Sequence, residues 1–301
     1  MPRSASRGRP RHLTEPLRFQ VLRVGFAISA DDPAVERRLR CLAQRAVQPE
    51  TPGEMIAYSV RRSNGAYQIL RNGAVQDVEY DHWRLLDSMY RSVQADALAA
   101  WPQAAVVRAV TGSWRGERFM VVGEPLRERS SLALHLLSRG AQVEADELAI
   151  LHDGMVTAYP RPLRVFGLDD PLPPGSPTRD ELPSVEEDSS RGPWMLDLAA
   201  AGIDWRVSTG VVERVVLLET NYGGQTRLHP VSRSEAARVV LSCCDARNNV
   251  PDTIRSIARL VDGAHCCRLR LGASEVIGDF WPLDWGDNLP ARNEKGSVRG
   301  R

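Results

Sequence analysis

The feature that most constrains the fold lies in the middle of the chain, where a β-rich run leads through a loop into a helix. The run is RFMVV, residues 118–122, and the helix is SLALHLLSRG, residues 131–140. The helix pattern closes at Gly140, a residue that adopts the left-handed conformation of a helix C-terminus without strain. A strand that feeds into a helix in this way favours an α/β fold, in which the helix packs on a sheet.

Composition excludes several classes of protein. The chain has 301 residues, 43% hydrophobic and 26% charged, which suits a globular protein with one large or two modest domains. It has no apolar run as long as a membrane span and no signal-peptide pattern, and its net charge of +1 gives no global field. We therefore expect a cytoplasmic protein without nucleic-acid or membrane partners.

The five cysteines are Cys41 and the adjacent pairs Cys243–Cys244 and Cys266–Cys267. Neighbouring cysteines rarely bond to each other, and an odd count argues against a disulfide framework. Because no CxxC spacing or histidine cluster accompanies them, buried reduced thiols are favoured over a structural metal site. Reduced thiols fit a reducing cytoplasm.

Residues 17–100 are expected to form a small α+β domain that follows a disordered tail at 1–16. An Asn64-Gly65 dipeptide between two short strand patterns favours a hairpin turn. The other expected elements are strands at 19–30 and 55–63 and helices at 33–46 and 81–101.

Residues 101–282 are expected to form the second domain, and residues 283–301 a second tail. An acidic, proline-rich segment at 169–192 is too polar to pack and predicts a mobile loop. Asp153-Gly154 predicts a tight turn. The remaining elements are strands at 104–110, 118–122, 143–151, 212–219 and 265–272 and helices at 131–140, 232–244 and 252–263.

The central loop lies where a phosphate-binding loop would lie. In the pattern G-x-x-x-x-G-K-[ST], Gly123 matches the first glycine and Ser130 the hydroxyl. Glu128 stands at the second glycine and Arg129 at the lysine. This match alone is equally compatible with an ordinary strand-to-helix turn.

The surroundings of the loop carry a more specific pattern. Over residues 103–165 the chain resembles the HPr kinase/phosphorylase family, in which a GxSGxGKST loop leads a helix ending in Arg-Gly. A Ser-Asp-Asp or Ser-Asp-Glu turn and a Pro-Arg-Pro segment follow in that family. The shared positions are Gly123, Ser130, Ser131, Leu132, Ala133, Arg139, Gly140, Asp146, Glu147 and Pro160–Pro162.

The resemblance implies a P-loop-containing HPr kinase/PEP carboxykinase-like core and an ATP-dependent serine kinase. Gly123, Glu128, Arg129, Ser130 and Ser131 would then line the nucleotide site. Ser130 and Asp146 would hold Mg²⁺, Asp146 with its neighbour Glu147 would act as base, and Arg161 would contact phosphate. Members of the family are often oligomers, which makes a homo-oligomer an option here.

The loop departs from the family where the chemistry takes place. Leu126 and Glu128 replace glycines, Pro125 replaces a serine, and Arg129 replaces the lysine. Leucine and glutamate lack the backbone freedom of glycine, and proline lacks an amide donor. A carboxylate ~4 Å from a phosphate charge repels it by roughly 4 kcal/mol at an effective dielectric near 20. A planar guanidinium also fits the place of a compact ammonium poorly.

Two functions remain in competition. The first is a pseudokinase with no tightly bound cofactor, which binds a peptide or protein partner in a biosynthetic pathway, such as one for ribosomally made peptides. The alternative is an active serine kinase that uses ATP and Mg²⁺, with Arg127 and Arg129 clasping phosphates in a new way. Nucleic-acid binding through the Arg-rich tails is weaker, because no aromatic residues or known module accompany the arginines.

Overall fold

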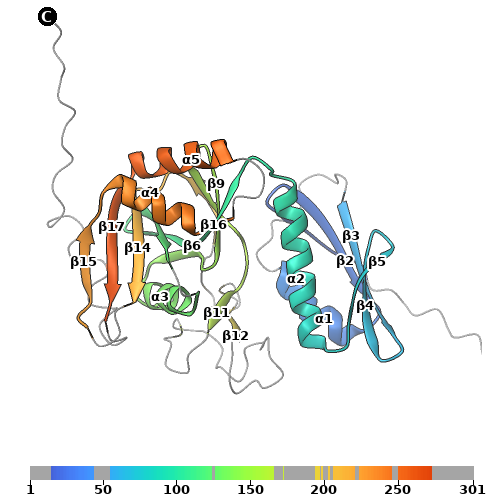
Figure 1. Ribbon diagram of the computed structural model, residues 1–301. Coiled ribbons are helices and arrows are strands. Elements are labelled where there is room, and N and C mark those ends of the chain that lie inside the picture. Colours follow the sequence, from blue (N-terminus) through green and yellow to red (C-terminus); the bar gives the residue numbers. More distant parts are fainter. Residues whose placement is uncertain are drawn as a thin grey trace, which may run out of the picture. The chain divides into compact units, whose positions relative to one another are not determined.

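The protein is a mixed α/β structure with two compact units, each described separately (Figure 1). The first unit contains residues 1–103, 159–168 and 174–207, and the second contains residues 104–158, 169–173 and 208–301. The computed structural model describes residues 15–43, 55–123, 126–165, 172, 194–196, 198, 203, 206–220, 224–245 and 250–272.

The first unit is built on a five-stranded sheet in the order β1-β2-β3-β4-β5. Neighbouring strands are antiparallel except for β2 and β3, which are parallel and need a crossover between them. Helix α1, Pro33–Ala43, lies in that crossover. The strands are β1 Leu17–Val21, β2 Val24–Ala30, β3 Met55–Ser63, β4 Ala66–Arg71 and β5 Ala74–Glu79.

Hairpin turns account for much of this order. The predicted Asn64-Gly65 turn is confirmed, with φ of 51° and 83°, because both residues tolerate the left-handed backbone that a tight hairpin requires. The single strand predicted at 19–30 is wrong. It is an antiparallel pair, β1 and β2, that turns at Leu22 with φ of 55°. Leucine is rare in that conformation, so the sequence carries no turn signal there.

Helix α2, His82–Ala99, is joined to the sheet by a partly buried polar contact. The Tyr58 hydroxyl donates to Oδ2 of Asp96 at 2.7 Å, and Arg71 donates to both Asp96 carboxylate oxygens at 2.8 and 3.0 Å. Burial, followed by the Asp96 contact, raises the pKa of Tyr58 above its usual value. This carboxylate therefore joins the helix to β3 and β4.

A short two-stranded sheet also belongs to the first unit. Strand β11, Leu163–Val165, pairs in antiparallel fashion with β12, Trp194–Leu196. The sequence placed residues 159–165 in the second domain, which was expected to span residues 101–282. The chain instead leaves the second unit after Ala158.

The second unit contains a large mixed sheet in the order β13-β10-β9-β6-β7-β14-β17-β15, with β8 and β16 also paired to β6. Its parallel section is β7-β14-β17. The bounds are β6 Ala105–Trp114, β7 Glu117–Val122, β8 Gln142–Ala145, β9 Leu148–His152, β10 Met155–Ala158, β13 Thr209–Gly210, β14 Arg214–Thr220, β15 Arg227–Pro230, β16 Cys244–Asp245 and β17 His265–Leu271.

Three helices pack against this sheet. Helices α4, Arg233–Ser242, and α5, Val250–Gly263, share one hydrophobic core with β6, β7, β9 and β14. Ser232 caps α4 by accepting the amide of Glu235 at 3.2 Å. Helix α3, Leu126–Ser138, follows β7 and contacts β6 and β8. The strand–helix order predicted for this unit is therefore present.

Several expectations concern residues outside the described ranges. The tails at 1–16 and 283–301 and the loop at 169–192 fall there, apart from Glu15, Pro16 and Leu172. Among the helices that the structure describes, none combines the length and apolar character that crossing a membrane requires.

Replacing Asp96 by alanine should destabilise the first unit by about 2 kcal/mol, because the substitution removes three hydrogen bonds and leaves the Tyr58 hydroxyl buried. Urea unfolding measures the change. Asp87→Ala, on the same helix, breaks only an exposed pair with Arg91 and should cost less than about 0.5 kcal/mol. Equal losses of unfolding free energy in the two variants would contradict a role of Asp96 in joining α2 to the sheet.

Candidate functional site

The central loop is shorter than the sequence predicted. Helix α3 begins at Leu126, so Glu128, Arg129 and Ser130 are helical residues, whereas the sequence placed them in a loop that runs from 123 to 130. The polypeptide thus passes from the end of β7 into a helix within three residues. In a phosphate loop, several glycine-rich residues would precede the helix.

Gly123 is required by a close approach of two strands. Its φ is +143°, and a Cβ atom there would lie 2.4 Å from the carbonyl oxygen of Leu218 on β14. Any larger residue would push β7 and β14 apart at this point. The first glycine of the motif therefore has a packing role that does not depend on a bound phosphate.

Arg129 is turned back toward the end of β7. Its side chain is among the largest fully buried ones, at 1% exposure, and Nη1 donates a hydrogen bond to the Gly123 carbonyl oxygen. Burying a guanidinium is costly unless its donors find acceptors, and the residue that follows β7 offers such a carbonyl. The residue at the lysine position is thus bonded to the residue at the first glycine position.

Ser130 and Asp146, which the family resemblance suggests as ligands of one Mg²⁺ ion, are in direct contact. The Ser130 hydroxyl donates to Oδ2 of Asp146 at 2.9 Å, and both residues are 0% exposed. Asp146 and Glu147 form the bend between β8 and β9, where the Glu147 carbonyl accepts the amide of Ala109 on β6 at 2.8 Å. This hydrogen bond fixes the bend against the central strand.

Hydroxyl and carboxylate oxygens are ligands that Mg²⁺ prefers, so Ser130 and Asp146 have suitable chemistry for the ion. Their complete burial means that a cation reaches them only if the segment moves. Within the described residues, no cluster of three or more His, Cys, Asp and Glu side chains is positioned to bind a metal ion. The fit to a magnesium nucleotide is therefore partial.

Glu128 lies in the first turn of α3 and is half-buried. The N-terminal end of a helix carries partial positive charge from its free amides, which attracts anions. Here the protein supplies its own carboxylate at that end. The electrostatic feature that would draw a phosphate is already neutralised by a side chain.

Ser131 and Arg161, the other predicted nucleotide-binding residues, differ in burial and in contacts. Ser131 is half-buried in α3. Arg161 belongs to the first unit and is 2% exposed, with its guanidinium carbon 5.8 Å from the centre of the Tyr90 ring. That ring meets Tyr159 edge to face, and burial raises the pKa of the Tyr159 phenol well above its ordinary value. Its described contacts thus give Arg161 an aromatic packing role.

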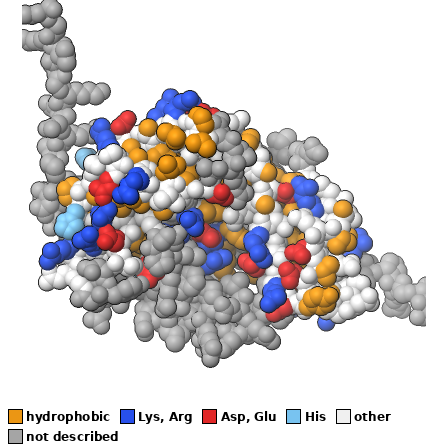
Figure 2. All heavy atoms as spheres, viewed as in Figure 1, with side chains coloured by type: hydrophobic (Ala, Val, Ile, Leu, Met, Phe, Trp, Pro, Cys, Tyr) orange, Lys and Arg blue, Asp and Glu red, His pale blue; other side chains and the backbone are white. Residues whose placement is uncertain are grey.

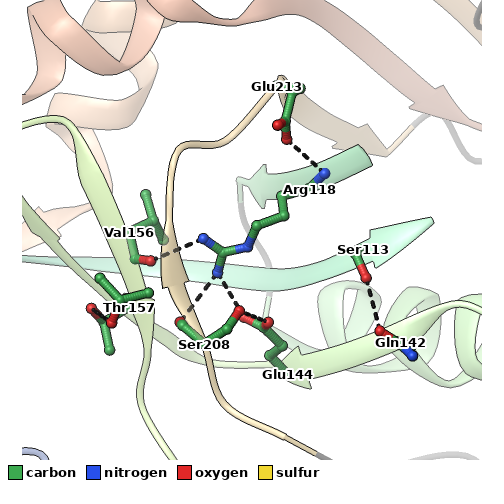
Figure 3. Close-up of polar contacts among 9 residues, drawn as sticks. Ser113, Arg118, Gln142, Glu144, Val156, Thr157, Ser208 and Glu213 are labelled. Atoms are coloured by element: carbon green, nitrogen blue, oxygen red, sulfur yellow. Dashed lines mark hydrogen bonds and ion pairs between the residues drawn. The ribbon is translucent and has the colours of Figure 1, made fainter. Parts of the chain in front are cut away.

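A second polar cluster, absent from the sequence analysis, surrounds Arg118 on β7 (Figure 3). Its Nη2 donates to Oε2 of Glu144 on β8 at 2.9 Å and to the Ser208 carbonyl at 3.2 Å, while Nη1 donates to the Val156 carbonyl at 3.3 Å. The Ser208 hydroxyl also donates to Glu144. Arginines occur throughout the sequence, so no local signal singles this one out.

The Arg118 cluster fixes the short strand β13 in place. A Cβ atom at Gly210 would lie 2.7 Å from Nη1 of Arg118, so a larger residue there would shift the guanidinium. The side chains of Arg118 and Glu144 are only 15% and 9% exposed, so their charges compensate each other away from water. The arrangement joins β7, β8 and β10 to the segment that returns from the first unit.

The cysteine pairs are in the second unit. The four cysteines whose side chains are described are free thiols, and three of them, Cys243, Cys266 and Cys267, are buried. Burial raises the pKa of Cys244 and Cys266 to about 11 and that of Cys267 to about 12. Such thiols stay protonated near neutral pH, which makes them poor nucleophiles and poor metal ligands.

Comparison with known proteins adds no family assignment. No protein-family model matches the chain, and no curated protein matches it significantly. The functional interpretation therefore rests on the residues themselves, above all on Arg129, Ser130 and Asp146 around the start of α3.

Replacing Arg118 by methionine should lower the free energy of unfolding by about 3 kcal/mol, because Glu144 is then buried without its counter-charge. Adding Glu144→Gln should recover at least about 1 kcal/mol of that loss. Urea denaturation of the single and double variants tests this. A double variant that is less stable than Arg118→Met would contradict charge compensation as the cause.

Stability should fall in alkaline solution because of Cys267. The pKa of this thiol is raised to about 12 in the folded protein. Its contribution to stability is therefore complete below the unfolded pKa of about 8.5 and is lost as pH rises toward about 12. Between about pH 9 and 11, the free energy of unfolding should fall with pH in both proteins. We expect the fall to be smaller for Cys267→Val than for the unaltered protein, by about 1 kcal/mol per pH unit. The free energies of unfolding are measured by urea titration under reducing conditions at several pH values. If they fall equally with pH in the two proteins, Cys267 is not the cause of the alkaline destabilisation.

Proposed function

We propose that the chain is a pseudokinase with an HPr kinase-like core, which no longer binds ATP·Mg²⁺ and acts as a peptide- or partner-binding component of a biosynthetic pathway. The observation that carries the proposal is the burial of Arg129 against the Gly123 carbonyl. In a working loop, the side chain at this position reaches outward to the β- and γ-phosphates.

Two energetic costs oppose nucleotide binding. Arg129 must first leave its buried contact with Gly123, and this costs free energy before any phosphate is gained. Glu128 then places a carboxylate at the helix end that phosphate would approach. A repulsion of roughly 4 kcal/mol corresponds to about three orders of magnitude in affinity.

The residues around the start of α3 make contacts that need no ligand. Gly123 packs against Leu218, and Ser130 bonds to Asp146. A fold can keep its architecture while its function moves to other surfaces. This supports a binding role, for which a peptide of a ribosomally made peptide pathway is a suitable partner class.

An active serine kinase is the second candidate, and the contact between Ser130 and Asp146 favours it. In that reaction, Asp146 or Glu147 takes the proton of an acceptor hydroxyl. The acceptor oxygen bonds to the γ-phosphorus, the bond to the β,γ-bridging oxygen breaks, and ADP leaves. Arg129 would have to swing away from Gly123 to contact the phosphates.

Titration of ATP·Mg²⁺ into the full chain by calorimetry separates the two. We expect no binding tighter than about 1 mM for the unaltered protein, because Arg129 and Glu128 oppose the phosphates. The variant Leu126→Gly/Glu128→Gly/Arg129→Lys should bind at least about tenfold more tightly. Adding Asp146→Asn to that variant should remove the dependence on Mg²⁺.

Tight nucleotide binding or phosphate transfer by the unaltered chain would overturn the pseudokinase proposal. Urea unfolding of the triple variant establishes that it is folded before the comparison is made. If the folded triple variant gains no affinity, these three residues are not what excludes the nucleotide. The single change Glu128→Gln then separates the charge effect from the backbone effect.

A further inference from the structure

The outermost strand of the first unit is open along one side. Strand β5 ends the sheet order, and in the part of the chain that the structure describes no strand pairs with its outer edge (Figure 1). Residues 74–78 are all exposed. The opposite edge differs, because β1 buries Phe19 and Val21. An open edge presents unpaired backbone donors and acceptors to an added strand.

A bulge gives this edge an apolar side. The β4–β5 register shifts between Ile69 and Leu70, so that Val75 lies opposite Leu70 and Val78 lies opposite Gln68. Because opposed residues share a face, the two valines lie on the same face although they are three positions apart. They are 57% and 40% exposed, and Tyr80, just beyond the strand, is 80% exposed. Figure 2 shows hydrophobic side chains at the surface of this unit.

The other face of the edge is acidic. Asp77 lies opposite Ile69 and Glu79 opposite Tyr67, which places both carboxylates on the face that carries α2. Ser88 of α2 donates to Glu79 at 2.6 Å, which fixes that carboxylate in place. Asp77 is exposed. The edge is therefore amphipathic, with valines on one side and carboxylates on the other.

We propose that β5 binds an extended peptide by strand addition, and that the peptide alternates apolar and basic residues. Main-chain hydrogen bonds to the edge would provide affinity, and the alternating side chains would provide specificity. Apolar residues would cover Val75 and Val78, while basic residues on the opposite side would meet Asp77 and Glu79.

A second copy of the chain fits this edge less well. Two β5 strands paired in antiparallel fashion would bring their Asp77 and Glu79 carboxylates together on one face, and like charges across a strand pair are destabilising. Bulges and edge charges are also common devices against self-association of strands. The occupant favoured by the charges is a basic, strand-forming peptide.

This inference rests on the proposed partner-binding role and names the surface and the class of partner for it. The two fail separately, because nucleotide binding at α3 and peptide binding at β5 are measured by different titrations. Nucleotide binding by the unaltered chain would contradict the pseudokinase proposal but not the peptide site. Failure of the peptide to bind would contradict the peptide site but not the pseudokinase proposal.

The test is a fluorescence anisotropy titration of the full chain with a labelled peptide of about eight residues that alternates valine and lysine. We expect saturable binding that weakens with salt. The variant Val75→Ser/Val78→Ser should bind at least about tenfold more weakly, and Asp77→Lys should weaken binding and reduce its salt dependence. Circular dichroism confirms that each variant is folded.

Two matched controls identify the edge. Val250→Ser/Ile254→Ser removes two equally exposed apolar side chains, at 54% and 52%, from α5 and should leave the affinity unchanged. A peptide N-methylated at every residue lacks backbone donors on both of its edges and should not bind by strand addition.

Four results would overturn the proposal. They are no binding up to about 1 mM peptide, equal binding by Val75→Ser/Val78→Ser, equal binding of the N-methylated peptide, and a dimer in sedimentation experiments that Val75→Ser/Val78→Ser dissociates. The last result would assign the edge to a second copy of the chain.

Discussion

The close approach of β7 to β14 at Gly123 is the constraint on which the centre of the second unit depends. A backbone carbonyl of Leu218 lies where a side chain would otherwise be, so β7 can end here only with a glycine. The strand end then offers its own carbonyl to Arg129, and α3 starts directly afterwards. Ser130, one residue further, is placed to reach Asp146 at the bend after β8. The contacts of Gly123, Arg129 and Ser130 thus lie close together around the start of α3.

The contacts of the motif residues do not depend on a bound phosphate. Gly123 packs against Leu218, Arg129 donates to the Gly123 carbonyl, and Ser130 donates to the buried Asp146 carboxylate. Each of these interactions stabilises the folded chain in the absence of phosphate. The residues that face a triphosphate in a working loop are therefore under structural constraint here, and a motif match by itself does not establish catalysis.

The two units contribute different kinds of surface. In the second unit, charges such as those of Arg118 and Glu144 are turned inward, where they join strands and the segment that returns from the first unit. In the first unit, β5 leaves valines, carboxylates and backbone groups exposed. If the loop is closed to nucleotides, an open strand edge is a place where a partner-binding function can reside.

Local patterns predicted much of the fold. Helices α1, α2, α4 and α5, the Asn64-Gly65 hairpin and the strand before Gly123 follow from periodicity and turn chemistry. Local patterns did not predict that α3 begins at Leu126, that residues 19–30 form two strands, or that residues 159–165 belong to the first unit. Leu22 has no turn-forming side chain, and Gly123, just before α3, packs against Leu218, which is almost a hundred positions away in the sequence.

The sequence by itself determined the α/β class, the order of most elements and the chemical identity of the loop residues, because these depend on near neighbours in the chain. Only the tertiary structure decided where the charges go. The burial of Arg129, the pairing of Arg118 with Glu144 and the open edge at β5 depend on which strands become neighbours. Strand pairing joins residues that are distant in sequence, and no local pattern encodes it.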